Sequence, residues 1–199
     1  MLQPLIALAA AAALSATAPP PKNPCVGAPS DVTIAGPDEP GERVVVEGRV
    51  LRADGRSPAP GVTVYAYQTD ADGLYSKVRG TTPRLRGWAT TDADGWFTFR
   101  TIRPAPYPSR TIPAHLHFHL WGGGAPPQWS LDVFFDDDPL VTEAVRARSS
   151  GPGAEAVVRK PVRKAEGVWR VDHEIVLKER PDRFSSNIRH GLDSCGVVP

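Results

Sequence analysis

The chain lacks several features that define large classes of protein. It has one methionine, two cysteines and a net charge of only +1, and its lysines and arginines are scattered rather than grouped. This charge pattern gives no basic surface of the kind that binds nucleic acid. Stretches with a helical hydrophobic period are scarce, whereas 22 prolines and 18 glycines favour turns and short strands. With 41% hydrophobic residues, its 199 residues suit one globular domain with a real core.

The one long apolar run lies at the N-terminus. Residues 5–14 are apolar and rich in alanine, and Ala16-Thr17-Ala18 forms a small-x-small cleavage site, although no lysine or arginine precedes the run. The run is too short for a membrane-spanning helix. We therefore expect residues 1–18 to be a signal peptide and the mature chain to be secreted or periplasmic, without a transmembrane segment. The alternatives are an uncut membrane anchor and a wrongly chosen start codon.

The expected export affects the oxidation state of the two cysteines. Cys25 follows the expected cleavage site, and Cys195 lies near the C-terminus. An even pair in an oxidising compartment is plausibly a disulfide. Such a bond would close a long loop and contribute about 4–5 kcal/mol in the chain-entropy model. Two independent free thiols are the alternative.

Short runs of alternating or β-branched residues predict strands at 43–51, 62–68, 87–91, 96–102, 115–120, 129–135, 157–159 and 168–177. A tight turn at 92–95 predicts that two of them form a hairpin, residues 122–127 a flexible turn, and 140–148 a short helix or turn. The pattern predicts an all-β fold, a β-sandwich of roughly seven to nine mostly antiparallel strands with little helix. Residues 19–42 would be an extended arm, 43–180 the sandwich, and 181–199 a tail.

Three of the five histidines alternate with apolar residues along one expected strand. Side chains two positions apart on a strand share a face, with Cα atoms roughly 6.5–7 Å apart. Two of the imidazoles can therefore bind one metal ion, whereas the outer pair lies roughly 13 Å apart and cannot easily do so. The stretch predicts a two-histidine metal site with one spare histidine, drawn from His115, His117 and His119.

Four blocks in a fixed order resemble the intradiol ring-cleavage dioxygenases, which open catechol and protocatechuate rings with non-haem ferric iron. The blocks, with a weaker fifth at 133–139, are Gly48-Arg49-Val50, residues 70–75, residues 87–108 and Pro113-Ala114-His115-Leu116-His117-Phe118. The specific part is the Pro-Ala-His-x-His-Phe block with the upstream Pro106-Tyr107-Pro108. The resemblance covers roughly residues 43–140 and implies a β-sandwich with iron at its edge.

The resemblance implies a ligand set of two tyrosines and two histidines for Fe(3+), namely Tyr75, Tyr107, His115 and His117. Ferric iron is a hard ion that favours anionic oxygen donors. Its charge would lower the tyrosine pKa far below the usual value of about 10, so that both side chains could bind as phenolates. The histidines must be neutral to bind, and metal affinity should therefore fall at acidic pH.

The resemblance also implies the reaction. A catechol-type aromatic diol would displace Tyr107 and react with O2, and the ring would open between the two hydroxyl-bearing carbons to give a muconate-type diacid. Many members carry an arginine three residues before the first histidine, where this chain has Ile112, and Arg110 could substitute from the loop. The predicted catalytic residues are therefore Tyr107 and Arg110. Asp132 aligns with a glutamine of the family.

The sequence is also compatible with two other functions. One is a non-catalytic secreted β-sandwich that binds metal and an aromatic or carbohydrate ligand. The other is a zinc hydrolase that uses His115 and His117, although zinc more typically takes a further histidine, cysteine or carboxylate than two phenolates. Outside the proposed ligand set, Tyr65 and Tyr67 are expected to pack or to lie at the rim. His119 should lie beside the site, and His173 and His190 should lie at the surface.

Overall fold

The computed structural model describes residue 25 and residues 27–78, 82–151, 153–154, 156–164, 166–181 and 195. The predicted signal peptide at 1–18, His190 and most of the predicted tail at 181–199 lie outside these residues. Eleven strands and one short helix form within them. In the part of the chain that is described, no helix is both long and apolar enough to cross a membrane.

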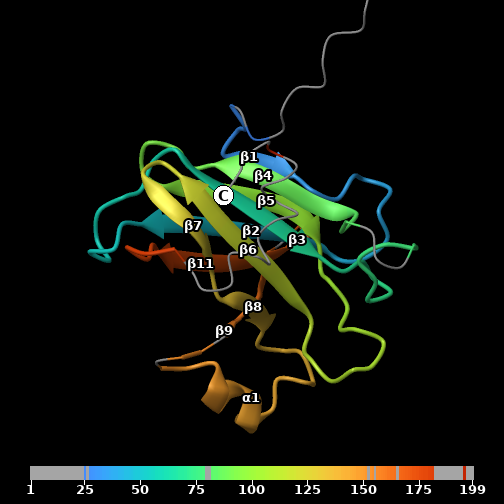
Figure 1. Ribbon diagram of the computed structural model, residues 1–199. Helices are drawn as coiled ribbons and strands as arrows, with labels where there is room; N and C mark the ends of the chain where they lie inside the picture. Colours follow the sequence, from blue (N-terminus) through green and yellow to red (C-terminus); the bar gives the residue numbers. More distant parts are fainter. Residues whose placement is uncertain are drawn as a thin grey trace, which may run out of the picture.

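Two sheets stack face to face and enclose the core (Figure 1). The first sheet has the order β1 (Asp31–Thr33), β5 (Trp96–Ile102), β2 (Arg43–Leu51), β11 (Trp169–Val176) and β10 (Val162–Arg163). The second has the order β4 (Leu85–Thr90), β3 (Val62–Gln68), β6 (His115–Gly122), β8 (Asp132–Phe135) and β9 (Ala156–Arg159), and β7 (Ala125–Trp129) also pairs with β6. Helix α1 (Glu143–Arg148) lies beyond β8 and β9.

The predicted all-β sandwich is confirmed, with eleven strands in place of seven to nine. Most pairings are antiparallel, and the exceptions are β1 with β5, β2 with β11, and β8 with β9. Burial alternates along β2, β4 and β11, whereas β3 and β6 are buried at almost every position. The core between the sheets includes Val46, Phe97, Phe99, Phe118 and Val171. Burying each such side chain contributes about 1.5–3 kcal/mol.

The predicted hairpin between 87–91 and 96–102 is wrong. The turn itself forms, and the amide of Gly95 donates to the carbonyl of Asp92 at 3.1 Å. However, β4 pairs with β3 and β5 pairs with β2, so the chain passes from one sheet to the other at this turn. Both strands bury an apolar face in the same core, from Ala89 on one side and Phe97 on the other. A turn motif specifies a reversal of the chain, but it does not specify which layer the next strand joins.

The predicted single strand at 129–135 is two strands. β7 pairs with the C-terminal half of β6, and β8 pairs with its N-terminal half. Between them the amide of Ser130 donates to the carbonyl of Phe118 at 2.9 Å, where the chain steps along β6. The predicted flexible turn at 122–127 is also shorter than expected, because β7 already begins at Ala125. The sequence pattern did not predict β1, which lies within the expected arm at 19–42 and extends the first sheet.

His173 lies in the core rather than at the surface, where it was expected. Its side chain is 3% exposed, and its ring lies 5.0 Å from that of Phe118 across the sandwich. It alternates with exposed residues along β11, so it shares the inward face with Val171 and Ile175. Burial, assisted by the positive charge of Arg159, lowers the pKa of His173 to about 3, and the imidazole is therefore neutral near pH 7.

The predicted disulfide between Cys25 and Cys195 is present. The Cα atoms are 5.5 Å apart, within the range that this bond requires, and 170 positions separate the two residues in the sequence. The cysteines pack with Tyr65 and Trp121 on the second sheet. The bond therefore attaches the segment before β1 to a residue near the end of the chain.

Removing this disulfide should lower the free energy of unfolding by about 4–5 kcal/mol, because the unfolded chain then loses the constraint of a very long loop. The measurement is guanidinium denaturation of the full chain and of a Cys25→Ser/Cys195→Ser double variant. The wild-type chain with added reductant serves as the control and should match the variant. Equal denaturation midpoints for the oxidised wild type and the double variant would contradict the prediction.

Candidate metal centre

Strand β6 places two histidines side by side on the outer face of the second sheet. His115 and His117 alternate with the fully buried Leu116 and Phe118, which fix the direction of the strand. The two imidazole centroids are 4.5 Å apart, with the rings nearly perpendicular. The predicted shared face of His115 and His117 is confirmed, and their rings lie next to each other on it.

Hydrogen bonds fix the orientation of both rings. Nδ1 of His115 donates to the carbonyl of Pro113 at 2.7 Å, and Nδ1 of His117 lies 2.7 Å from a carboxylate oxygen of Asp132. Because a carbonyl and a carboxylate can only accept, each Nδ1 carries the proton and each Nε2 presents a lone pair. Burial lowers the pKa of His115, which favours the neutral ring that a metal requires.

Two tyrosines from separate loops meet these lone pairs. The hydroxyl of Tyr75 lies 2.7 Å from Nε2 of His117 and 2.5 Å from the hydroxyl of Tyr107. The hydroxyl of Tyr107 lies 3.3 Å from Nε2 of His115. The structure thus brings together all four predicted ligands, and we name them the Tyr–His cluster.

The spacing of these atoms fits one metal ion. Donors bound at 2.0–2.1 Å and at right angles about an ion lie about 2.9 Å from each other. The neighbouring atoms of the Tyr–His cluster are 2.5–3.3 Å apart, which brackets this value. Two phenols with two imidazoles form the donor set that a hard, highly charged cation such as ferric iron favours over zinc.

Burial sets the protonation of the two phenols in the chain alone. It raises the pKa of Tyr75 and of Tyr107, and the contact with Tyr107 raises that of Tyr75 further. Both hydroxyls therefore keep their protons at neutral pH unless a cation lies between them. Their function as phenolates would depend on the ion itself.

From the sequence alone, Asp132 has no predicted role beyond its alignment with a glutamine of the family. Its ligand atoms and those of His115 and His117 lie within 4.8 Å of one another, so these three residues could also hold an ion. However, Asp132 contacts Nδ1 of His117, the nitrogen opposite the one that faces Tyr75. This is the usual place of a carboxylate that orients a metal-binding histidine. We therefore place Asp132 behind His117 rather than among the ligands.

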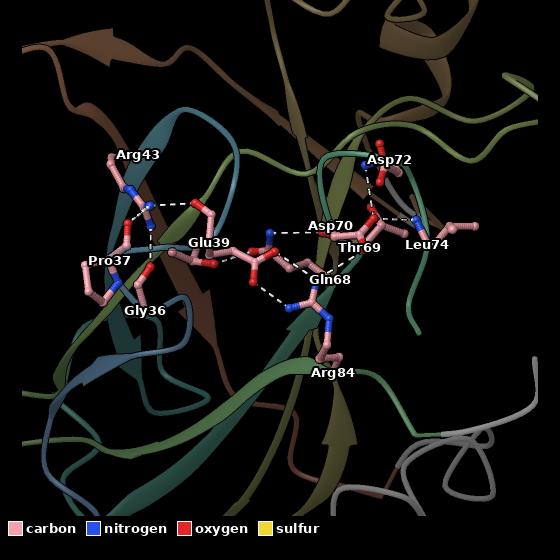
Figure 2. A network of polar contacts seen from close by, with 11 residues as sticks. Gly36, Pro37, Glu39, Arg43, Gln68, Thr69, Asp70, Asp72, Leu74 and Arg84 are labelled. Atoms are coloured by element: carbon pink, nitrogen blue, oxygen red, sulfur yellow. Dashed lines mark hydrogen bonds and ion pairs between the residues drawn. The ribbon is translucent and has the colours of Figure 1, made fainter. Parts of the chain in front are cut away.

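Asp70 joins the two loops that carry the tyrosines, and Figure 2 shows its contacts with Asp72, Leu74 and Arg84. Its side chain accepts hydrogen bonds from the amides of Asp72 and Leu74, both at 3.0 Å, and so shapes the turn that ends at Tyr75. Its carbonyl accepts from the amide of Ala105 at 3.0 Å, two residues before Tyr107. The carboxylate also pairs with Arg84 at 3.2 Å, and Arg84 in turn bonds Glu39 at 2.8 Å.

The same two loops touch at Gly73. This residue has φ of +78°, and a Cβ added there would overlap the carbonyl oxygen of Pro106. Only glycine allows both the left-handed backbone and the close approach. Gly73 and Asp70 therefore hold the Tyr75 loop against the segment that leads into Tyr107.

The structure does not bring the other predicted catalytic residue into the Tyr–His cluster. Arg110 is exposed, and within the described residues its guanidinium makes no hydrogen bond or ion pair. Its amide donates to the carbonyl of Tyr107 at 2.7 Å, and its φ of 52° is unusual for a residue with a side chain. Ile112, at the position of the family's arginine, is 41% exposed.

The remaining aromatic residues support the cluster. Tyr67 stacks on the ring of His117 with centroids 4.4 Å apart, and Tyr65 is fully buried beside it, as expected for packing residues. His119, the spare histidine, is 2% exposed, and its ring lies 5.4 Å from that of Tyr67. It lies beside the site, as predicted, and follows His117 along β6.

A cavity of about 600 Å³ adjoins the cluster. It is lined by Pro113, whose carbonyl anchors His115, and by Phe134, whose ring lies 5.8 Å from that of His115. Ile112 and Val145 add apolar surface, and among the described residues that line it Arg148 alone carries charge. A cavity of this volume accommodates a small aromatic molecule.

Comparison with known proteins points to one family. A family model described as Dioxygenase matches residues 27–179. The protocatechuate 3,4-dioxygenase beta chain of Burkholderia cepacia is 35% identical over 113 residues, which cover 51% of this chain and 48% of that protein. The hydroxyquinol 1,2-dioxygenase of a Rhizobium species is 29% identical over 167 residues, covering 70% and 56%. The chain thus spans about half the length of these curated relatives.

Solved structures share the fold. The dioxygenase domain of a dioxygenase–carbohydrate-binding protein fusion from Streptomyces sp. SirexAA-E superposes with a TM-score of 0.57 and 25% identity, covering 77% of this chain and 90% of that one. Catechol 1,2-dioxygenase from Acinetobacter sp. ADP1 gives a TM-score of 0.59 at 20% identity, covering 77% and 59%. At 20% sequence identity, the match to the Acinetobacter enzyme shows a shared fold only.

Gly73→Ala should weaken ferric iron binding by about tenfold or more, because the new Cβ would push away the segment at Pro106 that positions Tyr107. The matched control is Gly55→Ala, since Gly55 has a similar φ of +66° with nothing near its Cβ position. Both variants should be destabilised by the left-handed backbone, but only Gly73→Ala should lose affinity in an iron titration. Equal affinity for the two variants would contradict the role given to this contact.

Asp132→Ala should reduce iron affinity by about 10–100-fold, because His117 would lose the partner that orients its ring. Asp132→Asn keeps an acceptor for Nδ1 and should recover part of the loss. Asp172→Ala, on the exposed face of β11, serves as a control and should bind like the wild type. Complete loss of metal from Asp132→Asn would show that Asp132 is itself a ligand.

Proposed function

Because the chain belongs to the intradiol ring-cleavage dioxygenase family, we propose that it is a non-haem ferric enzyme that opens the ring of a catechol-type aromatic diol. The observation that carries this proposal is the convergence of two phenol oxygens and two imidazole nitrogens, each within 2.5–3.3 Å of a neighbour. Zinc sites seldom use such a donor set, which argues against the zinc hydrolase alternative.

The proposed reaction balances without an outside reductant. The C–C bond between the two hydroxyl-bearing carbons breaks, both atoms of O2 enter the product, and a muconate-type diacid results. The diol itself supplies the four electrons that reduce O2. When bound, ferric iron would act as the Lewis acid that holds the diol oxygens and makes the ring reactive toward O2.

The chain's own residues would bind the diol and move its protons. As the diol binds, the Tyr107 oxygen would accept a proton from a substrate hydroxyl. His115 and His117 would stay in place, because Pro113 and Asp132 hold their Nδ1 atoms. Tyr75 would also stay, since Asp70 bonds the amide of the preceding residue, Leu74.

The adjoining cavity supports an aromatic substrate. Ile112, Phe134 and Val145 provide apolar walls for a ring that extends from the metal. Arg148 gives the cavity one positive charge, which would favour a diol with an acidic substituent.

The family's arginine is absent at Ile112, and we propose that Arg110 acts in its place when the loop closes over substrate. Its left-handed backbone, of a kind that concentrates at functional sites, supports this proposal.

We also propose that the enzyme acts outside the cytoplasm. Two observations support this location, namely the apolar run at residues 5–14 and the disulfide between Cys25 and Cys195. Disulfides of this kind persist in oxidising compartments. Export to the periplasm or to the medium agrees with both.

The test is the visible spectrum and oxygen uptake of the iron-loaded chain. Phenolate-to-iron charge transfer should colour the wild type, and catechol should change the band and start oxygen uptake. Tyr75→Phe and Tyr107→Phe should lose much of the band and reduce kcat/KM by about 100-fold or more, because each removes an anionic ligand. Tyr67→Phe removes a hydroxyl outside the proposed ligand set and keeps the ring that stacks on His117, so this variant should keep the colour and most of the activity.

Three results would count against the proposal. A colourless protein that retains zinc in preference to iron would favour the hydrolase alternative. Full colour in both tyrosine variants would overturn the ligand set. A coloured wild type that takes up no oxygen with catechol, protocatechuate or hydroxyquinol would favour a non-catalytic protein that binds metal and an aromatic ligand.

A further inference from the structure

A second cavity, of about 410 Å³, is lined by residues of β7, β9 and β11 and of the segments next to these strands. No described residue that lines it belongs to the Tyr–His cluster, and among the described residues it shares only Gly153 and Ala154 with the cavity next to that cluster. Its volume lies within the usual range for small-molecule sites. It is therefore a separate space, and the proposed function makes no use of it.

His173 lines this cavity and is an unusual residue to find there. It is 3% exposed, and neither Nδ1 nor Nε2 has a hydrogen-bond partner among the described residues. A buried polar atom without a partner costs free energy, and such atoms are rare in folded proteins. An imidazole that is needed only for packing against Phe118 could be replaced by phenylalanine without this cost. The side chain is therefore arranged to meet a partner inside the cavity.

Arg159 gives the same cavity a positive charge. It ends β9, and its guanidinium is near enough to His173 to help to keep that imidazole neutral. Among the described residues, Arg159 has no ion pair or side-chain hydrogen bond, although its own carbonyl accepts from Asp136. The guanidinium thus retains all of its donors for a ligand.

The other polar lining groups leave the cavity suited to an anion. Lys178 also lines it, and its ammonium donates to the carbonyl of Trp129 at 2.7 Å. Among the described residues of the lining, the acidic one is Glu174, which follows His173 along β11 and exposes its side chain on the opposite face of the strand. The rest of the wall is largely apolar, with Leu131, Val157 and Ile175.

We propose that this cavity is a second ligand site that binds a small organic carboxylate with an apolar body, held by Arg159 and His173. A carboxylate has two acceptor oxygens, which match the paired donors of a guanidinium and the single N–H of a neutral imidazole. An apolar body would then cover Leu131, Val157 and Ile175. Inorganic anions would lack this second contribution and bind more weakly.

The test uses benzoate as the probe and the full chain with its disulfide intact. Calorimetric titration should detect benzoate binding to the wild type, and benzyl alcohol, its neutral counterpart, should bind about tenfold more weakly or worse. Arg159→Met keeps the apolar stem but removes the charge, and it should weaken benzoate binding by about tenfold or more. His173→Phe should also weaken benzoate binding. If His173→Phe does not fold, the result for Arg159→Met alone tests the proposal.

The matched control is Arg148→Met, which removes the charged residue among the described residues that line the cavity beside the Tyr–His cluster. It should leave unchanged the benzoate binding that depends on Arg159, and the visible spectrum in the same titration shows whether benzoate also reaches the metal. Loss of binding in Arg148→Met but not in Arg159→Met would place the probe in the other cavity and overturn the proposal. No heat and no change in Tm with benzoate up to about 10 mM would overturn it too. Neither result depends on oxygen uptake, so the proposed function is tested separately.

Discussion

The contact between two loops, at Asp70 and at Gly73, is the constraint on which the metal centre depends. The histidines need little help, because β6 and two hydrogen bonds fix their rings. The tyrosines lie on irregular segments, where each ordered residue costs about 1–2 kcal/mol of conformational entropy. Asp70 offsets part of this cost for both loops together, through bonds to Leu74 on one side and Ala105 on the other. The two phenols are therefore positioned relative to each other before any ion binds.

Strand β6 links the stability of the fold to the geometry of the centre. Its inward side chains fill the middle of the core, and its outward side chains provide the two imidazoles. A shift of its pairing by one residue would turn the core side chains outward and place the histidines between the sheets. Hydrophobic burial thus holds His115 and His117 in register, and the second sheet acts as a rigid platform for residues that loops supply.

The sequence alone predicted the parts of this structure that depend on local periodicity. The bounds of β2, β3 and β5 and the shared face of the histidines follow from alternation, which each strand carries within itself. The tyrosines came only from resemblance to a family, because nothing local ties a loop residue to a distant strand. The wrong hairpin, the break between β7 and β8, the bond from Asp132 to His117 and the burial of His173 have a common cause. Each depends on which segments meet in space, and the composition of a single segment does not encode that.

The pairing of β11 with β2 determines when the chain can fold during its synthesis. Residues Trp169–Val176 lie parallel to the first long strand, in register from Val44 to Leu51, and occupy an inner position of the first sheet. Until β11 has left the ribosome, β2 presents an unpaired edge and the inner face of that sheet is incomplete. Contacts between segments so distant in sequence form slowly, and unpaired edges of this kind favour aggregation. The sandwich can therefore close only after β11 has been synthesised, and until then the free edge of β2 can pair with other chains.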